Sequence, residues 1–89
     1  MRQMFRYEVP VDDQAHAFAL TCNPVAAANA AGDVVEFWAE HDDDPGFSRA
    51  FRVFGTGQPL PEDAEWIATC PRTASGLVWH LYEIPVGAL

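Results

Sequence analysis

Apolar and polar side chains alternate with a period of two in several short segments of this chain, and no other feature constrains its fold as strongly. The pattern is clearest over residues 34–41, where Val35, Phe37 and Ala39 occupy every second position. Successive side chains of a β-strand point to opposite faces, so this alternation predicts a strand with one buried face. The same reasoning predicts further strands over residues 4–11, 14–20, 49–54, 65–69 and 77–84.

The segments between these strands have the composition of turns. Asp, Gly, Pro and Ser are concentrated at residues 12–13, 41–46, 55–57 and 71–76. Each of these residue types favours a tight change of chain direction. Short strands joined in this way predict a mainly β domain: a small antiparallel meander, barrel or sandwich of about six or seven strands, with little or no helix.

Residues 23–32 give a conflicting signal. Asn23 is a good N-cap, Pro24 suits the first helical position, alanines follow, and Gly32 could end a helix. These local signals predict a short helix. An isolated helix of this length is marginal in water, so tertiary context decides between helix and strand.

The length of the chain predicts one domain. Two independent cores would each be too small within 89 residues, so we expect a single β domain over residues 1–89, ordered from about residue 4 to residue 84. No run of about 18 apolar residues and no basic-then-apolar leader occurs, which predicts a cytoplasmic protein. Cys22 and Cys70 are predicted to be small buried hydrophobes, and the sequence leaves open whether they approach each other.

The charge is strongly negative. The chain has thirteen acidic residues and five basic ones, all of them arginine, which gives a formal net charge of −8. A chain without a basic stripe has nothing to offer a phosphate backbone. We therefore expect no direct binding to nucleic acid and none to membranes.

The sequence offers no motif for catalysis or metal binding. No Ser or Cys lies in a nucleophile-elbow context, and no His or Cys spacing matches a zinc site. Residues 41–44, His-Asp-Asp-Asp, lack the alternate spacing of a calcium loop and predict a solvated acidic turn. Residues 55–57, Gly-Thr-Gly, lack the third Gly and the Lys of a phosphate loop and predict a tight turn. We expect no enzyme activity, metal or cofactor.

The alternation also predicts a second face that carries aromatic residues. If Val35, Phe37, Ala39, Phe51, Val53, Trp79 and Leu81 fill the core, their neighbours point the other way. The candidate binding residues on that side are Trp38, Arg52, Phe54, His80 and Tyr82. Two interpretations remain open. Other strands of a barrel or sandwich cover this face, or it is an aromatic patch rimmed by charge that binds a partner or a second copy.

Several blocks of the chain resemble a family of short uncharacterised phage and prophage proteins of actinobacterial type. The blocks are Phe51-Arg52-Val53-Phe54-Gly55-Thr56-Gly57-Gln58-Pro59-Leu60, Trp66-Ile67-Ala68-Thr69, Leu77-Val78-Trp79-His80-Leu81-Tyr82-Glu83, Phe5-Arg6-Tyr7-Glu8-Val9 and Phe37-Trp38-Ala39. The similarity runs from about Phe5 to Glu83. It implies that the alanine-rich segment is a strand. Many members have His where this chain has Gln58, so no acid, base or ligand role is expected there.

The leading hypothesis is a small acidic phage-derived accessory protein, non-catalytic, that binds a protein partner such as a host factor in the host cytoplasm. Its charge suits a basic partner. The alternative is a small-ligand, nucleotide-like binder in which aromatic rings stack on a base and Arg52 meets a phosphate. A third hypothesis is a structural or assembly subunit. We also expect self-association as a homodimer, because a short chain covers one sheet face poorly.

Overall fold

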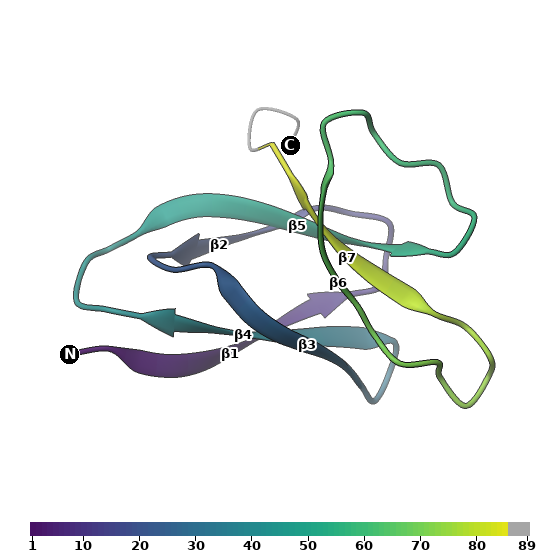
Figure 1. The fold of residues 1–89 in the computed structure, drawn as a ribbon, viewed down its shortest axis with the longest axis horizontal. Helices are drawn as coiled ribbons and strands as arrows, with labels where there is room; N and C mark the ends of the chain where they lie inside the picture. Colours follow the sequence, from purple (N-terminus) through teal and green to yellow (C-terminus); the bar gives the residue numbers. More distant parts are fainter. Residues whose placement is uncertain (86–89) are drawn as a thin grey trace.

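The computed structural model describes residues 1–85. These residues form seven strands (Figure 1): β1 Gln3–Pro10, β2 His16–Leu20, β3 Pro24–Ala30, β4 Val34–His41, β5 Phe47–Gly55, β6 Glu65–Thr69 and β7 Trp79–Ile84. No helix occurs among the described residues, so none there could cross a membrane. The mainly β prediction is confirmed. The first strand begins at Gln3, and the part of the chain beyond Pro85 lies outside the described residues.

The strands form two antiparallel sheets. One sheet has three strands in the order β1-β4-β3, and the other has four in the order β2-β5-β7-β6. Strands β1 to β5 pass back and forth between the two ends of the long axis (Figure 1), and β7 runs antiparallel beside β5. Across the sandwich, β1 approaches β5 and β3 approaches β6. The prediction of a meander, barrel or sandwich therefore resolves to a two-sheet sandwich.

The core lies between the two sheets and contains the predicted residues. The fully buried side chains include Val35, Phe37 and Ala39 from β4, Phe51 and Val53 from β5, and Leu81 from β7. Phe37 of the three-stranded sheet meets Phe51 of the four-stranded sheet with ring centroids 4.9 Å apart. Rings in this range attract each other beyond simple burial, so this pair joins the two layers. Trp79 is only half-buried but packs against the same core.

The disputed alanine-rich segment is strand β3, as the family resemblance implied. It pairs with the central strand β4, where Ala27 lies opposite Phe37 and Asn29 lies opposite Val35. Asn29 also donates from Nδ2 to the carbonyl of Pro71, at 2.6 Å, which ties β3 to the segment that follows β6. These contacts are distant in sequence, and they outweigh the local helix signals because a helix of this length has little stability alone.

The two cysteines are both free and lie near opposite ends of β3. Cys22 precedes the strand, whereas Cys70 adjoins the Pro71 carbonyl that Asn29 contacts near the other end. At about 3.3 Å per residue, that separation exceeds the reach of a disulfide. Cys70 is buried as predicted, while Cys22 is half-buried.

Candidate functional site

Four of the five predicted binding residues lie together, and the fifth does not. Arg52 pairs with Tyr82 and Phe54 pairs with His80 between β5 and β7, so all four share the outer face of the four-stranded sheet. Trp38 lies opposite Arg6 on the outer face of the three-stranded sheet. The prediction that Trp38 shares their side is wrong, because the sandwich separates the two outer faces by its whole thickness.

Phe54 is not available to a partner. Its side chain is 1% exposed although it points away from the sandwich core. The Arg52 guanidinium carbon lies 4.4 Å from the centre of its ring, and Tyr82 contacts it edge-on with centroids 5.5 Å apart. Gln58 and Leu60, from the connection between β5 and β6, line the hollow beside it. Phe54 therefore forms a small second core under this connection, which corrects its assignment as a binding residue.

Arg52 is held over Phe54 with few polar partners. Its nearest carboxylate is Asp13, with Nη2 3.7 Å from Oδ1, and its buried Nε has no hydrogen-bond partner among the described residues. A guanidinium has five N–H donors, and a buried donor without an acceptor is costly. By contrast, Arg49 makes two short bonds to Glu83, of 2.8 and 2.7 Å.

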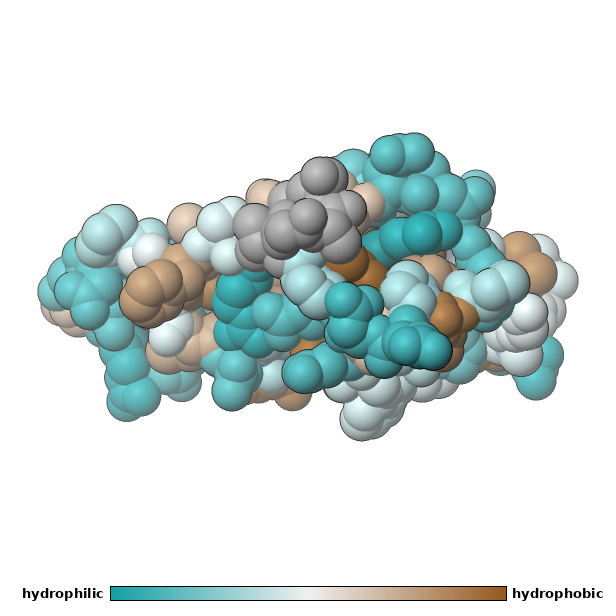
Figure 2. All heavy atoms as spheres, turned by 90° about the horizontal axis from the view of Figure 1, so that it is seen from above, coloured by the Kyte–Doolittle hydropathy of each residue, from teal (hydrophilic) through white to brown (hydrophobic). Residues whose placement is uncertain are grey.

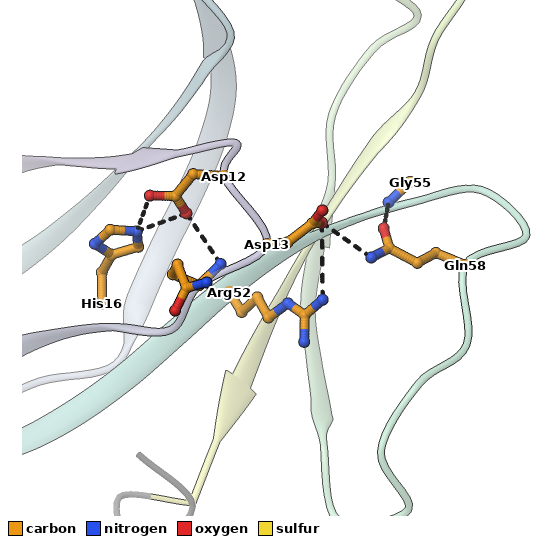
Figure 3. Close-up of polar contacts among 7 residues, drawn as sticks. Asp12, Asp13, His16, Arg52, Gly55 and Gln58 are labelled. Carbon is orange, nitrogen blue, oxygen red and sulfur yellow. Dashed lines mark hydrogen bonds and ion pairs between the residues drawn. The ribbon is translucent and has the colours of Figure 1, made fainter.

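Asp13 is itself fixed by a short chain of hydrogen bonds. Gln58 donates from Nε2 to Asp13 Oδ1 at 3.0 Å, and its Oε1 accepts from the backbone N–H of Gly55 at 3.0 Å (Figure 3). Asp13 has a φ of 61°, a conformation that Asp tolerates better than most residues. Gln58 thus joins the β1–β2 turn to the end of β5.

The neighbouring Asp12 closes the same turn. Its carboxylate accepts from the backbone N–H of Gln14 at 3.0 Å and lies 2.9 Å from Nε2 of His16 (Figure 3). The hydrogen bond with His16 is the main cause that lowers the pKa of Asp12 below its ordinary value. This carboxylate therefore stabilises the turn in its ionised form.

A hollow of about 430 Å³ opens beside Arg52. It is lined by residues of the β1–β2 turn, of β5, of the β5–β6 connection and of β7: Asp13, Gln14, Ala15, Arg52, Pro61, Asp63 and Ile84. Its volume lies within the range of small-molecule sites. One positive and two negative side chains line it, which disfavours a phosphate. No aromatic ring is among the described residues that line this hollow, so it offers no ring on which a base beside Arg52 could stack.

His80 belongs to a hydrogen-bonded row on the same face. Its Nε2 lies 2.9 Å from Oγ1 of Thr56, and its Nδ1 lies 2.8 Å from Oγ1 of Thr69. Thr69 in turn accepts from the indole N–H of Trp66 at 3.0 Å. Both ring nitrogens of His80 are thus engaged by hydroxyl groups. The row connects β6 and β7 to the turn at Thr56, which is the tight turn that the Gly-Thr-Gly motif predicts.

A third surface, missed by the sequence reasoning, lies at the end of the sandwich that carries the β4–β5 turn. Phe47 opens β5 there with 82% of its side chain exposed. It lines a hollow of about 320 Å³ with Thr21, Asp42, Asp44, Pro45 and Gly46. Other large apolar side chains exposed on the first residues of β1 and β3 are Met4, Phe5 and Val25. We call this end of the sandwich, with the β4–β5 turn and the exposed Phe47, the acidic end. The predicted strand began at Arg49, whereas β5 begins two residues earlier, so the prediction did not place Phe47 on a strand.

The turn at the acidic end is built by local hydrogen bonds. Asp42 accepts from the backbone N–H of Asp44 at 2.9 Å, and its own N–H donates to Thr21 Oγ1 at 3.0 Å. Gly46 has a φ of 79°, and a Cβ there would lie 2.7 Å from the carbonyl oxygen of Leu20. Only glycine fits this bend without displacing the backbone of β2. Across the described residues, no group of three or more His, Cys, Asp or Glu could hold a metal ion.

On the side of the molecule seen in Figure 2, the polar surface is interrupted by small apolar areas. Figure 2 shows hydrophilic residues over most of one side of the molecule, with hydrophobic groups in small areas between them.

A family model described as a domain of unknown function, DUF7352, matches residues 1–87 of the chain. Neither the curated proteins nor the solved structures contain a match to the chain.

Proposed function

The chain belongs to the DUF7352 family, whose function is unknown, and we propose that this member is a non-catalytic protein that acts by binding another protein. The observation that carries the proposal is the acidic end. There a largely exposed Phe47 lies beside the carboxylates of Asp42 and Asp44 around one hollow. Exposed aromatic residues next to a polar rim are typical of surfaces that bind proteins.

The charge of the chain supports a basic partner. A formal net charge of −8 on 89 residues attracts positive surfaces and repels nucleic acid and acidic proteins. Complementary charge accelerates association and selects the partner, while apolar contact provides much of the affinity. Asp44 and Phe47 bring both contributions to the same place, which is the arrangement that a basic and partly apolar partner would require.

The setting of this activity is also part of the proposal. The resemblance to phage and prophage proteins supports an accessory protein that acts in the host cytoplasm on a host factor. No catalytic constellation motivates an enzyme. His80 contacts Thr56, but its second partner is another neutral hydroxyl, that of Thr69, instead of the carboxylate that usually orients a catalytic histidine.

The test is an affinity capture that compares matched variants. The wild-type protein, Phe47→Ala and Trp66→Ala are immobilised in equal amounts and exposed to host extract, and bound proteins are identified by mass spectrometry. Trp66 is a suitable control because it is also an exposed aromatic residue, 60% accessible, but lies opposite Tyr82 on the outer face of the four-stranded sheet. We expect one or more basic proteins to bind the wild type and Trp66→Ala and to be lost with Phe47→Ala.

A purified partner then permits a quantitative comparison. Replacing Asp42 and Asp44 by Asn should slow association at low salt and leave a smaller effect at high salt, since salt screens exposed charges beyond about 8 Å at physiological ionic strength. The proposal is wrong if every captured protein binds Phe47→Ala as well as it binds the wild type. It is equally wrong if the captured proteins are acidic.

A further inference from the structure

We propose that the hollow beside Arg52 is a binding site for a small zwitterion, a molecule with a carboxylate and a protonated amine attached to the same carbon atom, such as an α-amino acid. This site is separate from the acidic end and does not depend on the proposed protein partner. The arginine side chains of this protein differ in how closely a hydrogen-bond acceptor approaches them.

Arg52 is the arginine with the weakest internal partner. Arg2, Arg6 and Arg49 each have a carboxylate oxygen within 2.9 Å, and Arg72 donates to the carbonyl of Gly76 at 2.9 Å. Arg52 has only Asp13 at 3.7 Å, and its buried Nε has no hydrogen-bond partner among the described residues. Its side chain is nevertheless three-quarters buried, with 26% exposed. A cation that has lost water without gaining acceptors favours an incoming carboxylate.

The surroundings of Arg52 are fixed before any ligand arrives. The guanidinium lies over the ring of Phe54, and Asp13 is anchored through Gln58 to the backbone of Gly55. A site held by such contacts loses little freedom when a ligand binds. Figure 3 shows Asp13 and Arg52 side by side, with Gln58 and Arg52 both directed at the same oxygen of Asp13.

The charges in the hollow define the ligand. Asp13 and Asp63 line it together with Arg52, so an anion without a cationic group would meet repulsion from two carboxylates. Because Arg52 and Asp13 are adjacent, the two groups that they recognise must also be adjacent in the ligand. A carboxylate bound to Arg52 and an ammonium bound to Asp13 satisfy this requirement. Ala15, Pro61 and Ile84 add apolar walls against which an aliphatic side chain can pack.

The experiment is a titration of the full chain followed by heteronuclear NMR, with L-leucine as the probe. Two control compounds each lack one of the two groups: isocaproate has no amine and isoamylamine has no carboxylate. Inorganic phosphate is the third control. We expect saturable shifts of the Arg52 Nε–H and of the Ile84 methyl groups with leucine in the millimolar range, and affinities weaker by roughly tenfold or more for each control compound.

Variants assign the effect to the two side chains. Arg52→Gln and Asp13→Asn should each weaken leucine binding by roughly tenfold or more, whereas Arg72→Gln, which removes the same charge from the β6–β7 connection, should bind as the wild type does. If Arg52→Gln fails to fold, Arg52→Lys is the replacement test. This variant keeps the charge but loses the planar pair of donors, and it should bind leucine more weakly than the wild type. The proposal fails if leucine gives no saturable shift, if isocaproate or phosphate binds as tightly as leucine, or if Arg72→Gln loses affinity as Arg52→Gln does.

Discussion

Replacement of Phe54 by Ala tests whether the outer face of the four-stranded sheet contains a second core. An exposed aromatic residue can be truncated with little effect, whereas a buried one leaves a cavity. Phe54 is 1% exposed, and its ring supports the Arg52 guanidinium and contacts Tyr82 edge-on. Because of this packing, we expect Phe54→Ala to destabilise the protein even though the residue lies outside the sandwich core.

The expected loss follows from what the ring contacts. Phe→Ala at a buried position costs about 3–5 kcal/mol, including the cavity. Phe54 is covered on its outer side by Arg52 and the β5–β6 connection, which can move inward, so we expect a loss near 3 kcal/mol. A chain of 89 residues has a total stability of roughly 4–13 kcal/mol. The variant should therefore fold with a much lower midpoint, and Phe54→Leu should lose about 1 kcal/mol.

The same strand provides the control. Phe47→Ala makes an identical change at the other end of β5, where the ring is 82% exposed, and it should alter stability by about 0.5 kcal/mol or less. Urea denaturation followed by the fluorescence of the tryptophans measures both, with unchanged m-values as evidence of a comparable transition. Equal effects of the two substitutions, or a loss below about 1 kcal/mol for Phe54→Ala, would refute the burial argument.

Three further predictions concern pH, thiol reactivity and assembly. The hydrogen bond with His16 lowers the pKa of Asp12 in the folded protein, so the contribution of Asp12 to stability is present above the ordinary Asp pKa and is lost as the pH falls through the folded value. Thermal melts should therefore show that Asp12→Asn flattens the decline in stability below about pH 4. Burial raises the pKa of the Cys70 thiol, so mass spectrometry after brief alkylation should show native label on Cys22 and label on Cys70 only after unfolding. The chain should form a homodimer that persists at high salt; a monomer of 9.8 kDa in sedimentation at both low and high salt would contradict this.

The sequence alone determined, within a few residues, where six of the seven strands lie and most of the residues by which β4, β5 and β7 enter the core. Alternation in β4, β5 and β7 is a local property, since successive side chains of one strand must point to opposite faces. Phe37, Phe51 and Leu81 could therefore be assigned to the interior without knowledge of the fold. The turns followed from residues such as Gly46 and Asp13, whose backbone conformations most other residues adopt only with strain.

Only the tertiary structure decided how these faces are combined. Alternation states which side of its own strand a residue occupies, but it does not state to which sheet the strand belongs. Alternation therefore assigned Trp38 and Arg52 to one face, whereas the two sheets of the sandwich separate them. Phe54 is buried by a connection rather than by a strand, and Phe47 is exposed because it lies at the end of a layer. The helix signals at Pro24 lost to pairing with β4 for the same reason: contacts distant in sequence outweigh local preference in so short a segment.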